Sequence, residues 1–497
     1  MGFLLYYSLF ISFALWLVIL LIISFCIFNS SQKVKLIKKV SLFFSFFQFV
    51  IILFFWILSD NINMLAEFDF YNFQFYKQWL FLFNFHYIIG IDNISLLFLL
   101  LTFLLTPICI LISWNSIKYK YNSFVICLIF ITFILFNIFC VLDLVFFYIF
   151  FESILIPMFI LIGVWGSRQR KIHAVYQLFF YTLFGSLLML LGILVIYSHI
   201  QTTDIRILYN TNFSFYRQLF LWLSFFFAFC VKVPLFPFHI WLPEAHVEAP
   251  TVGSVILAGV LLKLGTYGLL RFVIPVFCDA TYFFLPFVYT LCLLGIIYTC
   301  CSTIRQIDLK KVIAYASVSH MSFVILGLFS SNIQGIGGSV FLMLSHGIVS
   351  SGLFFCIGCI YDRYKTRILR YYSGLVATMP IFSLCLFVLI LSNISFPGTS
   401  SFVGEFLILV GLFENNHFAA LLATFSIILT AVYSIWLYNR IIFNKLTVGY
   451  YSKFSDFSKK EFVIGFIFCF ITILFGLKGS YIISLIEAPL YFYLNFK

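Results

Sequence analysis

Four full charges fall inside long apolar runs of this chain: Glu152, Lys232, Lys263 and Glu405. An ionisable side chain near the centre of a bilayer costs about 2.5–3.5 kcal/mol on insertion scales, so four would cost on the order of 10 kcal/mol. That cost is comparable to the whole net stability of a domain. A structural salt bridge can explain one such residue. Four of them in different runs favour a route for protons or ions.

Three histidines, His239, His320 and His346, lie in or beside the same kind of run. Ser317 and His320 are three residues apart, and His346 and Ser350 are four apart, so each pair shares one face of a helix. A lone histidine in a membrane span is more often a hydrogen-bonded packing residue. Together with the four charges, these three are predicted to act as proton relays.

Proline and glycine interrupt two of the apolar runs next to a charge. Lys232 precedes Pro234 and Pro237, and two prolines at that spacing break a helix, so Lys232 would end a half-helix at its negative dipole end. In the run 393–405, Ser401 is predicted to cap a second half-helix, with Glu405 in its first turn at the positive dipole end. Broken helices at membrane depth mark ion sites in transporters.

The other two charges lie on unbroken apolar segments. Glu152 is five residues before Pro157 on an otherwise apolar helix. Lys263 is near the middle of 252–270, whose small residues would let a neighbouring helix approach closely. Both are predicted to hold protons on the same route.

The composition indicates which elements position these residues. Of the 497 residues, 64% are hydrophobic and 9% are charged, whereas soluble proteins carry roughly 25% charged residues. This excludes a water-soluble enzyme, a disordered chain and a nucleic-acid-binding module. The sequence predicts an all-α polytopic membrane protein that forms a single membrane domain over 1–497, with no soluble domain in the polar-leaning stretch 59–87. Fourteen transmembrane helices, of which the seventh and the twelfth are broken, are expected at 3–28, 40–58, 88–113, 122–141, 143–163, 173–198, 214–239, 252–276, 281–301, 309–330, 333–361, 375–413, 416–443 and 461–486.

The basic residues support an even number of spans. Loops after odd-numbered spans and their flanks hold 21 of the 29 Lys and Arg. Two more are Lys232 and Lys263, and the other six are assigned to even-numbered loops and the termini: Lys77, Arg206, Arg217, Arg271, Lys478 and Lys497. By the positive-inside rule, both termini face away from the matrix or cytoplasm. The net charge of +12 is therefore explained by topology.

The two broken spans are five helices apart, which predicts an internal repeat. Glu152 precedes Lys232 by 80 residues, and His320 precedes Glu405 by 85. Five-helix units at 122–276 and 281–443 would be separated by an odd number of spans and inserted in opposite orientations. Such inverted repeats are typical of secondary transporters.

The 13 cysteines are scattered singly through apolar runs. The one CxxC motif, Cys356 to Cys359, lies inside an expected span and lacks further ligands at metal-site spacing. The sequence predicts no bound metal and no redox cofactor.

Several motifs resemble the antiporter-like subunits of respiratory complex I. The segment 229–271 contains their HxWLPxAHxEAPxxGS signature, and 308–323, 341–355 and 396–406 are similar to the same family. The similarity extends from Leu142 to Arg440. It implies fourteen core helices and a proton-translocating module without a flavin, iron–sulfur or nucleotide site, since NADH, FMN, iron–sulfur clusters and ubiquinone are used by other subunits.

The resemblance also implies roles for single residues. Glu152 and Lys232 would be a charged pair, Lys263 the central connecting lysine and Glu405 the residue toward the exit, with the three histidines along the axis. His246 and Glu248 fall in the same signature but after the break, and are predicted to be structural.

The expected partners are the other membrane-arm subunits, including homologous antiporter-like ones, and membrane lipids, without nucleic acid. The expected location is the mitochondrial inner membrane, with both termini toward the intermembrane space, and an organelle-encoded gene. Two alternatives stay open: a subunit of a multisubunit cation/proton antiporter, and a membrane scaffold that conducts nothing.

Overall fold

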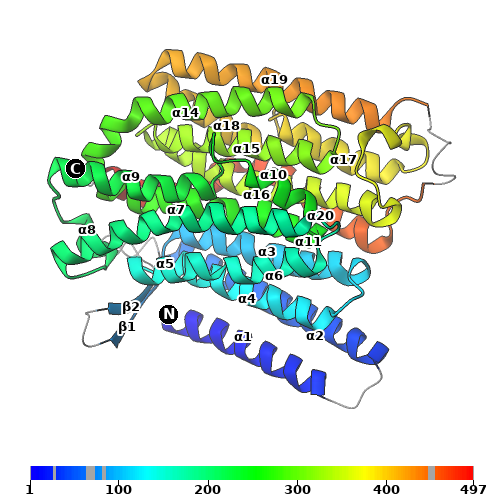
Figure 1. Ribbon diagram of the computed structural model, residues 1–497, viewed down its shortest axis with the longest axis horizontal. Helices are drawn as coiled ribbons and strands as arrows, with labels where there is room; N and C mark the ends of the chain where they lie inside the picture. The colour runs from blue at the N-terminus through cyan, green and yellow to red at the C-terminus, as the bar shows by residue number, and fades with distance from the viewer. Residues whose placement is uncertain (1, 26–29, 63–72, 81–84, 446–453, 496–497) are drawn as a thin grey trace.

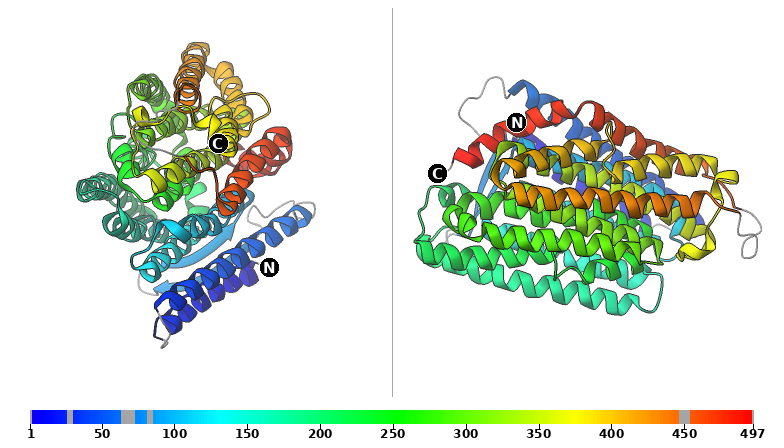
Figure 2. Two further views of the ribbon diagram at one scale, coloured as in Figure 1. Left: turned by 90° about the vertical axis from the view of Figure 1, so that its right-hand side faces the viewer. Right: turned by 90° about the horizontal axis from the view of Figure 1, so that it is seen from above.

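The computed structural model describes residues 2–25, 30–62, 73–80, 85–445 and 454–495. Long helices run side by side through the molecule (Figure 1), and a view from one end shows them almost along their axes (Figure 2, left). Among the described residues, thirteen helical segments are long and apolar enough to cross a membrane. They are α1 (Gly2–Phe25), α2 (Ser30–Ile62), α3 (Asn93–Ser116), α4 (Tyr121–Cys140), α5 with α6 (Leu144–Ser153 and Leu155–Trp165), α7 (Lys171–Ile200), α9 (Phe215–Lys232), the segment Thr251–Val276, α14 (Cys278–Ile304), α15 (Leu309–Leu328), α16 (Ile333–Tyr364), α19 (His417–Ile442) and α20 (Lys459–Leu477).

The twelfth predicted span consists of two shorter helices, α17 (Pro380–Asn393) and α18 (Ser400–Asn415). These helices have 14 and 16 residues, so each alone is too short to count among the thirteen membrane-crossing segments. Counted together, they complete the predicted fourteen. The prediction of an all-α multi-pass membrane fold is confirmed, and the chain is a multi-pass membrane protein.

The break in the seventh span lies where the prolines predict it. Helix α9 ends at Lys232, and α10 (Trp241–Glu248) begins after the Pro234–Pro237 segment. Two of the carbonyls released by the break find new donors: Leu235 N donates to Cys230 O at 3.0 Å, and the Trp241 indole donates to Val231 O at 2.9 Å. Such compensation is required of irregular backbone at membrane depth.

The break in the twelfth span differs from the prediction in its detail. Helix α18 begins at Ser400 with Thr399 at the N-cap position, so Glu405 lies in the second turn and the predicted Ser401 cap is wrong. The Ser401 hydroxyl instead donates across the break to the carbonyl of Ser392, the penultimate residue of α17. Ser401 therefore satisfies the end of α17.

Helices α5 and α6 form one span that is interrupted at Ile154. Pro157 has no N–H to donate to the Ser153 carbonyl, which accounts for the interruption at Ile154, two residues after Glu152. The span starts at Leu144, and Asp143 caps it: the Asp143 carboxylate accepts from Val145 N at 2.8 Å. Asp143 lies just outside the span, and burial raises the pKa of its carboxyl group.

The segment Thr251–Val276 contains two π-helical turns that the sequence does not predict. It runs through α11 (Thr251–Ile256), η2 (Leu257–Leu261), α12 (Leu262–Gly268), η3 (Leu269–Val273) and α13 (Ile274–Val276). Lys263 therefore follows a π-turn directly. Such turns inside α-helices are frequent at functional sites.

Two antiparallel strands, β1 (Phe73–Leu80) and β2 (Phe85–Ile91), form a hairpin before α3 that the sequence analysis does not predict. Of the polar-leaning stretch 59–87, residues 63–72 and 81–84 lie outside the described residues. The remaining elements are short or close the chain: α8 (Ile205–Tyr209), η4 (Leu369–Tyr371), η5 (Leu375–Ala377) and α21 (Gly479–Asn495).

Two spans form the centre of the molecule. The most apolar windows of α16 and of Thr251–Val276 are 100% buried, whereas those of the peripheral spans α2 and α20 are 28% and 22% buried. The backbones of the two central spans approach closely at Gly347 of α16 and Gly259 of η2. A Cβ atom added to Gly347 would lie only 2.9 Å from Gly259 O. These two spans carry His346 and Lys263.

Candidate functional site

The two central spans bring Lys263 and His346 together. Nζ of Lys263 lies 2.9 Å from Nδ1 of His346, and it also donates to Ala258 O in the preceding π-turn. Lys263 is 0% exposed and His346 is 5% exposed. A buried ammonium without partners would be strongly destabilising, so these two contacts explain how the lysine is tolerated.

His320 and Glu405 form a second buried pair next to the first. The imidazole Nδ1–H of His320, on α15, donates to Oε1 of Glu405, on α18, at 3.0 Å. The ring centroids of His320 and His346 are 5.7 Å apart. His320 Nε2 has no hydrogen-bond partner among the described residues. Four titratable residues from four different spans therefore form one line of neighbouring groups.

Polar groups continue the line beyond Glu405. The Tyr433 hydroxyl, on α19, is within electrostatic range of Glu405 and accepts from Asn393 Nδ2 at 3.4 Å. Both side chains are buried. Neither residue stands out in the sequence, because each is one uncharged polar residue of an apolar run.

Lys232 and Glu152 lie together at the other end of the predicted axis. Nζ of Lys232 lies 3.3 Å from Phe151 O and 4.2 Å from the centre of the Phe151 ring. The carboxylate of Glu152 interacts electrostatically with Lys232 and approaches Ser186. No direct ion pair joins Glu152 to Lys232 within the described ranges, and Glu152 Oε1 is buried without a hydrogen bond.

A cavity of about 20 Å³ borders Lys232, and its lining includes Leu257 and Leu261 of η2 and mostly apolar neighbouring side chains, but not Lys263. That space is sufficient for about one water molecule. The backbones of α9 and α12 approach each other closely, since a Cβ atom on Gly265 would lie 2.9 Å from Phe229 O.

His239 is not joined to this line by a contact of the described residues. It lies in the break between α9 and α10, 4% exposed, and its ring packs near Phe236, Tyr298 and Tyr315 at centroid distances of 5.8, 5.7 and 6.1 Å. Its Nδ1 has no hydrogen-bond partner there. Its role on the axis stays a prediction.

The structure also reveals a buried ion pair that the sequence analysis misses. Arg271 was assigned to a loop, but it lies in η3, 2% exposed, and its guanidinium donates to Oδ1 of Asp92 at 2.5 Å. Asp92 also caps α3 by accepting from Ser95 N at 3.0 Å. Tyr267 completes the cluster through its hydroxyl, which accepts from Arg271 Nε at 3.1 Å.

A further cluster of buried charge surrounds the end of α10. Lys310 is 1% exposed, and Arg367 is 0% exposed beside Glu248 at 3.7 Å. His246 lies close to Lys310, and both of its ring nitrogens are buried without a partner among the described residues. Sequence reasoning counted Lys310 and Arg367 as loop or span-end charges.

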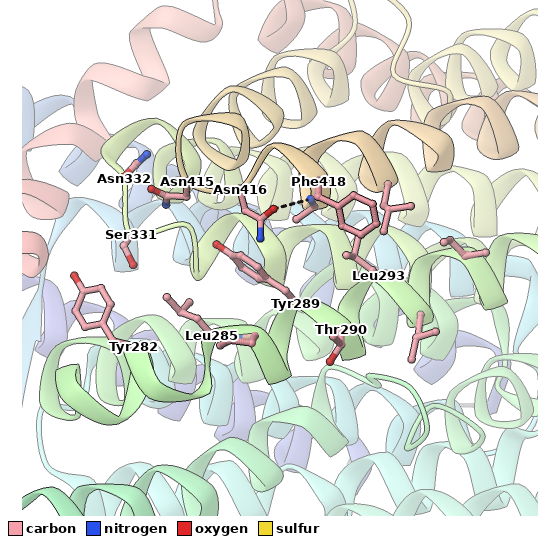
Figure 3. A pocket seen from close by; sticks show the side chains of 15 residues that line it. Tyr282, Leu285, Tyr289, Thr290, Leu293, Ser331, Asn332, Asn415, Asn416 and Phe418 are labelled. Atoms are coloured by element: carbon pink, nitrogen blue, oxygen red, sulfur yellow. Dashed lines mark hydrogen bonds between the residues drawn. The ribbon is translucent and has the colours of Figure 1, made fainter.

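A groove on the described surface is lined by a different set of residues (Figure 3). It measures about 870 Å³ and runs between α14 and α19, with Tyr282, Tyr289, Asn332 and Asn416 among its polar lining residues. None of the buried residues of the axis lines it.

Comparisons with known proteins identify the family of the chain. A family model described as "NADH:quinone oxidoreductase/Mrp antiporter, TM" matches residues 141–430, which contain every residue of the axis. NADH-ubiquinone oxidoreductase chain 4 of Acanthamoeba castellanii is 91% identical over 497 residues, 100% of both chains. The protein of the same name from Marchantia polymorpha is 57% identical over 436 residues, 87% of both chains.

Solved structures show the same arrangement of helices. A chain in the structure of respiratory complex I from Thermus thermophilus with bound NADH superposes with a TM-score of 0.84 at 25% identity, covering 92% of this chain and 95% of that one. A chain of the Mrp complex from Dietzia sp. DQ12-45-1b gives 0.85 at 17% identity, covering 99% and 98%, which shows a shared fold alone. The chain belongs to the NADH:quinone oxidoreductase/Mrp antiporter family of membrane subunits.

Proposed function

We propose that this chain is a proton-translocating subunit of the membrane arm of an NADH:ubiquinone oxidoreductase, in which electron transfer from NADH to ubiquinone in other subunits drives protons along the buried axis. The observation that carries the proposal is the line Lys263–His346–His320–Glu405, whose first and last contacts measure 2.9 and 3.0 Å. The names of the relatives at 91% and 57% identity support the assignment to this enzyme.

In this function the proton passes along Lys263, His346 and His320, and Glu405 supplies the negative charge at the end of the line. Lys263 delivers to His346, the facing rings carry the proton to His320, and the Glu405 carboxylate stabilises the imidazolium formed there. Lys232 with Glu152 forms a separate loading site. In this proposal the small, mostly apolar cavity beside Lys232, with Leu257 and Leu261 in its lining, is the gate toward Lys263, and protons cross it only when water enters.

The proposed location is the mitochondrial inner membrane, with both termini in the intermembrane space. The support is the distribution of basic residues, 21 of 29 of which follow odd-numbered spans and their flanks. The proposed partners are the other membrane-arm subunits, including homologous antiporter-like ones, and lipids. The proposal assigns no redox cofactor to this chain.

We also infer that the units 122–276 and 281–443 are inverted repeats. The support is the broken helix in each unit, α9–α10 in the first and α17–α18 in the second, with Lys232 and Glu405 beside the breaks. In this arrangement each unit would provide a half-channel toward one side of the membrane.

The second candidate is a subunit of a stand-alone cation/proton antiporter, favoured by the shared fold with the Mrp complex chain. Mild solubilisation, a native gel stained for NADH oxidation and mass spectrometry separate the two functions. We expect the chain in a very large band that oxidises NADH. Finding it only in a smaller band without that activity would favour the antiporter.

The variant Lys232→Met tests proton translocation itself. We expect the complex to assemble and the pumping that is coupled to NADH oxidation to be lost, because methionine keeps the length of the side chain and removes the proton carrier. Lys478→Met, at an exposed lysine after α20, is the matched control and should pump normally. If both variants pump like the wild type, the chain is a scaffold.

A further inference from the structure

His246, on α10, carries a cost that its packing does not explain. The side chain is 0% exposed, and neither ring nitrogen has a hydrogen-bond partner among the described residues. Leaving one buried polar atom unpaired costs about 1–3 kcal/mol. The ring stacks on Phe354 of α16 with centroids 4.5 Å apart and planes at 4°. A phenylalanine would stack there without two unpaired nitrogens, so the position of the imidazole points to proton transfer.

His246 packs against α16 at a level between the axis and the membrane surface. Phe354 is eight residues after His346 and eight before Asp362, which corresponds to about 12 Å of helix in each direction. Asp362 is near the end of α16, where the chain enters the basic loop 365–370. His246 is within electrostatic range of Lys263 and His346 on one side and of Lys310 on the other.

Lys310 extends this series toward the surface. It is the second residue of α15 and is 1% exposed, and its Nζ donates to Ala249 O, just after α10, at 2.8 Å. Asp362 is half-buried and interacts electrostatically with Lys310. The order Asp362, Lys310, His246 therefore runs from the basic-loop side of the membrane inward.

The remaining charged residues here hold the end of α10 in place. The guanidinium of Arg367 donates to Val247 O and lies 3.7 Å from the Glu248 carboxylate. The Glu248 carbonyl accepts from Ser167 N at 3.1 Å. Because Arg367 and Glu248 are anchored to each other, His246 and Lys310 are the groups left to exchange protons.

We propose that Asp362, Lys310 and His246 form a proton-uptake branch that supplies the Lys263–His346 pair from the basic-loop side of the membrane. The inference rests on the proposed function and adds an entry route to it. A proton taken from water by Asp362 passes to the neutral amine of Lys310. The ammonium donates it through water to one ring nitrogen of His246, and the other nitrogen releases one proton toward His346. Each group then returns to its starting charge.

The test uses the whole complex in proteoliposomes, with proton pumping measured per assembled complex. We expect His246→Gln and Lys310→Met to lower the rate of coupled pumping by about tenfold or more, as is usual when a proton-transferring group is removed. The matched control is Lys311→Met, because the neighbouring Lys311 is partly exposed and pairs with Glu244 at 2.9 Å. It should pump like the wild type.

A second variant separates proton transfer from stacking. His246→Phe keeps an aromatic ring against Phe354 and should lose pumping as His246→Gln does. Pumping at the wild-type rate by His246→Phe and Lys310→Met would overturn the branch. Lys263→Met is measured in parallel: if it abolishes pumping while those two variants pump normally, the branch fails and the proposed function stands. If Lys263→Met also pumps normally, the proposed function fails.

Discussion

Glu405→Gln is the perturbation that tests the line of contacts most directly. Glutamine keeps the size of the side chain and removes the negative charge that lies 3.0 Å from Nδ1 of His320. At an effective dielectric constant of 20, that charge stabilises an imidazolium by about 5 kcal/mol. Even a quarter of this energy corresponds to a factor of about ten in rate, because each 1.36 kcal/mol is tenfold. We therefore expect coupled pumping to fall by at least that factor.

The assay compares quenching of a pH-sensitive dye in proteoliposomes with the rate of NADH oxidation, after a native gel has shown equal assembly. Glu414→Gln is the matched control, because it makes the same substitution on the exposed end of the same helix. It should leave pumping unchanged. If Glu405→Gln pumps at the wild-type rate with normal assembly, the pair with His320 does not carry protons and the reasoning from its geometry is refuted.

Two further predictions concern stability, and both are measured as the amount of complex that survives heating on a native gel. Arg271→Met should destabilise the subunit by about 3–5 kcal/mol because it leaves the Asp92 carboxylate buried and unpaired, and adding Asp92→Asn should restore much of the loss. Gly265→Ala should cost about 1–3 kcal/mol because its Cβ would lie 2.4 Å from Val233 and 2.9 Å from a backbone oxygen. Gly163→Ala, where nothing lies within 4 Å of the new Cβ, should cost nothing. Equal losses for the two glycine variants would contradict the packing argument.

The spans and their breaks could be predicted because they depend on local chemistry. Apolar length identifies a span, and a missing proline N–H ends a helix wherever it occurs, as after Lys232. The details that failed depend on choices that local chemistry does not decide. Thr399, Ser400 and Ser401 can all cap a helix, and packing across the break made Ser401 serve α17 instead. The π-turns before and after Lys263's helix α12 likewise depend on tertiary contacts.

The buried charges could be predicted individually, but their pairing could not. Lys263 and His346 are visible because each interrupts an apolar run, yet 83 residues separate them. Nothing in the run around Lys263 indicates that its partner is a histidine on α16. Lys263 and His346 pair because the two central spans, Thr251–Val276 and α16, lie against each other. Small residues such as Gly259 allow this close approach.

The residues that the sequence analysis missed share a position rather than a type. Lys310, Arg367 and Arg271 lie at the ends of spans or directly after them, where the positive-inside rule or ordinary solvation already explains a basic residue. Yet they are only 1%, 0% and 2% exposed. Because topology accounts for a basic residue at such a place whether it is solvated or buried, the sequence signal is the same in both cases. A buried basic residue differs from a solvated one only in whether another part of the chain covers the span end. The end of α10 covers Lys310 in this way, through the carbonyl of Ala249. A proton entrance must lie at a span end, so it lies where sequence alone carries the least information about it.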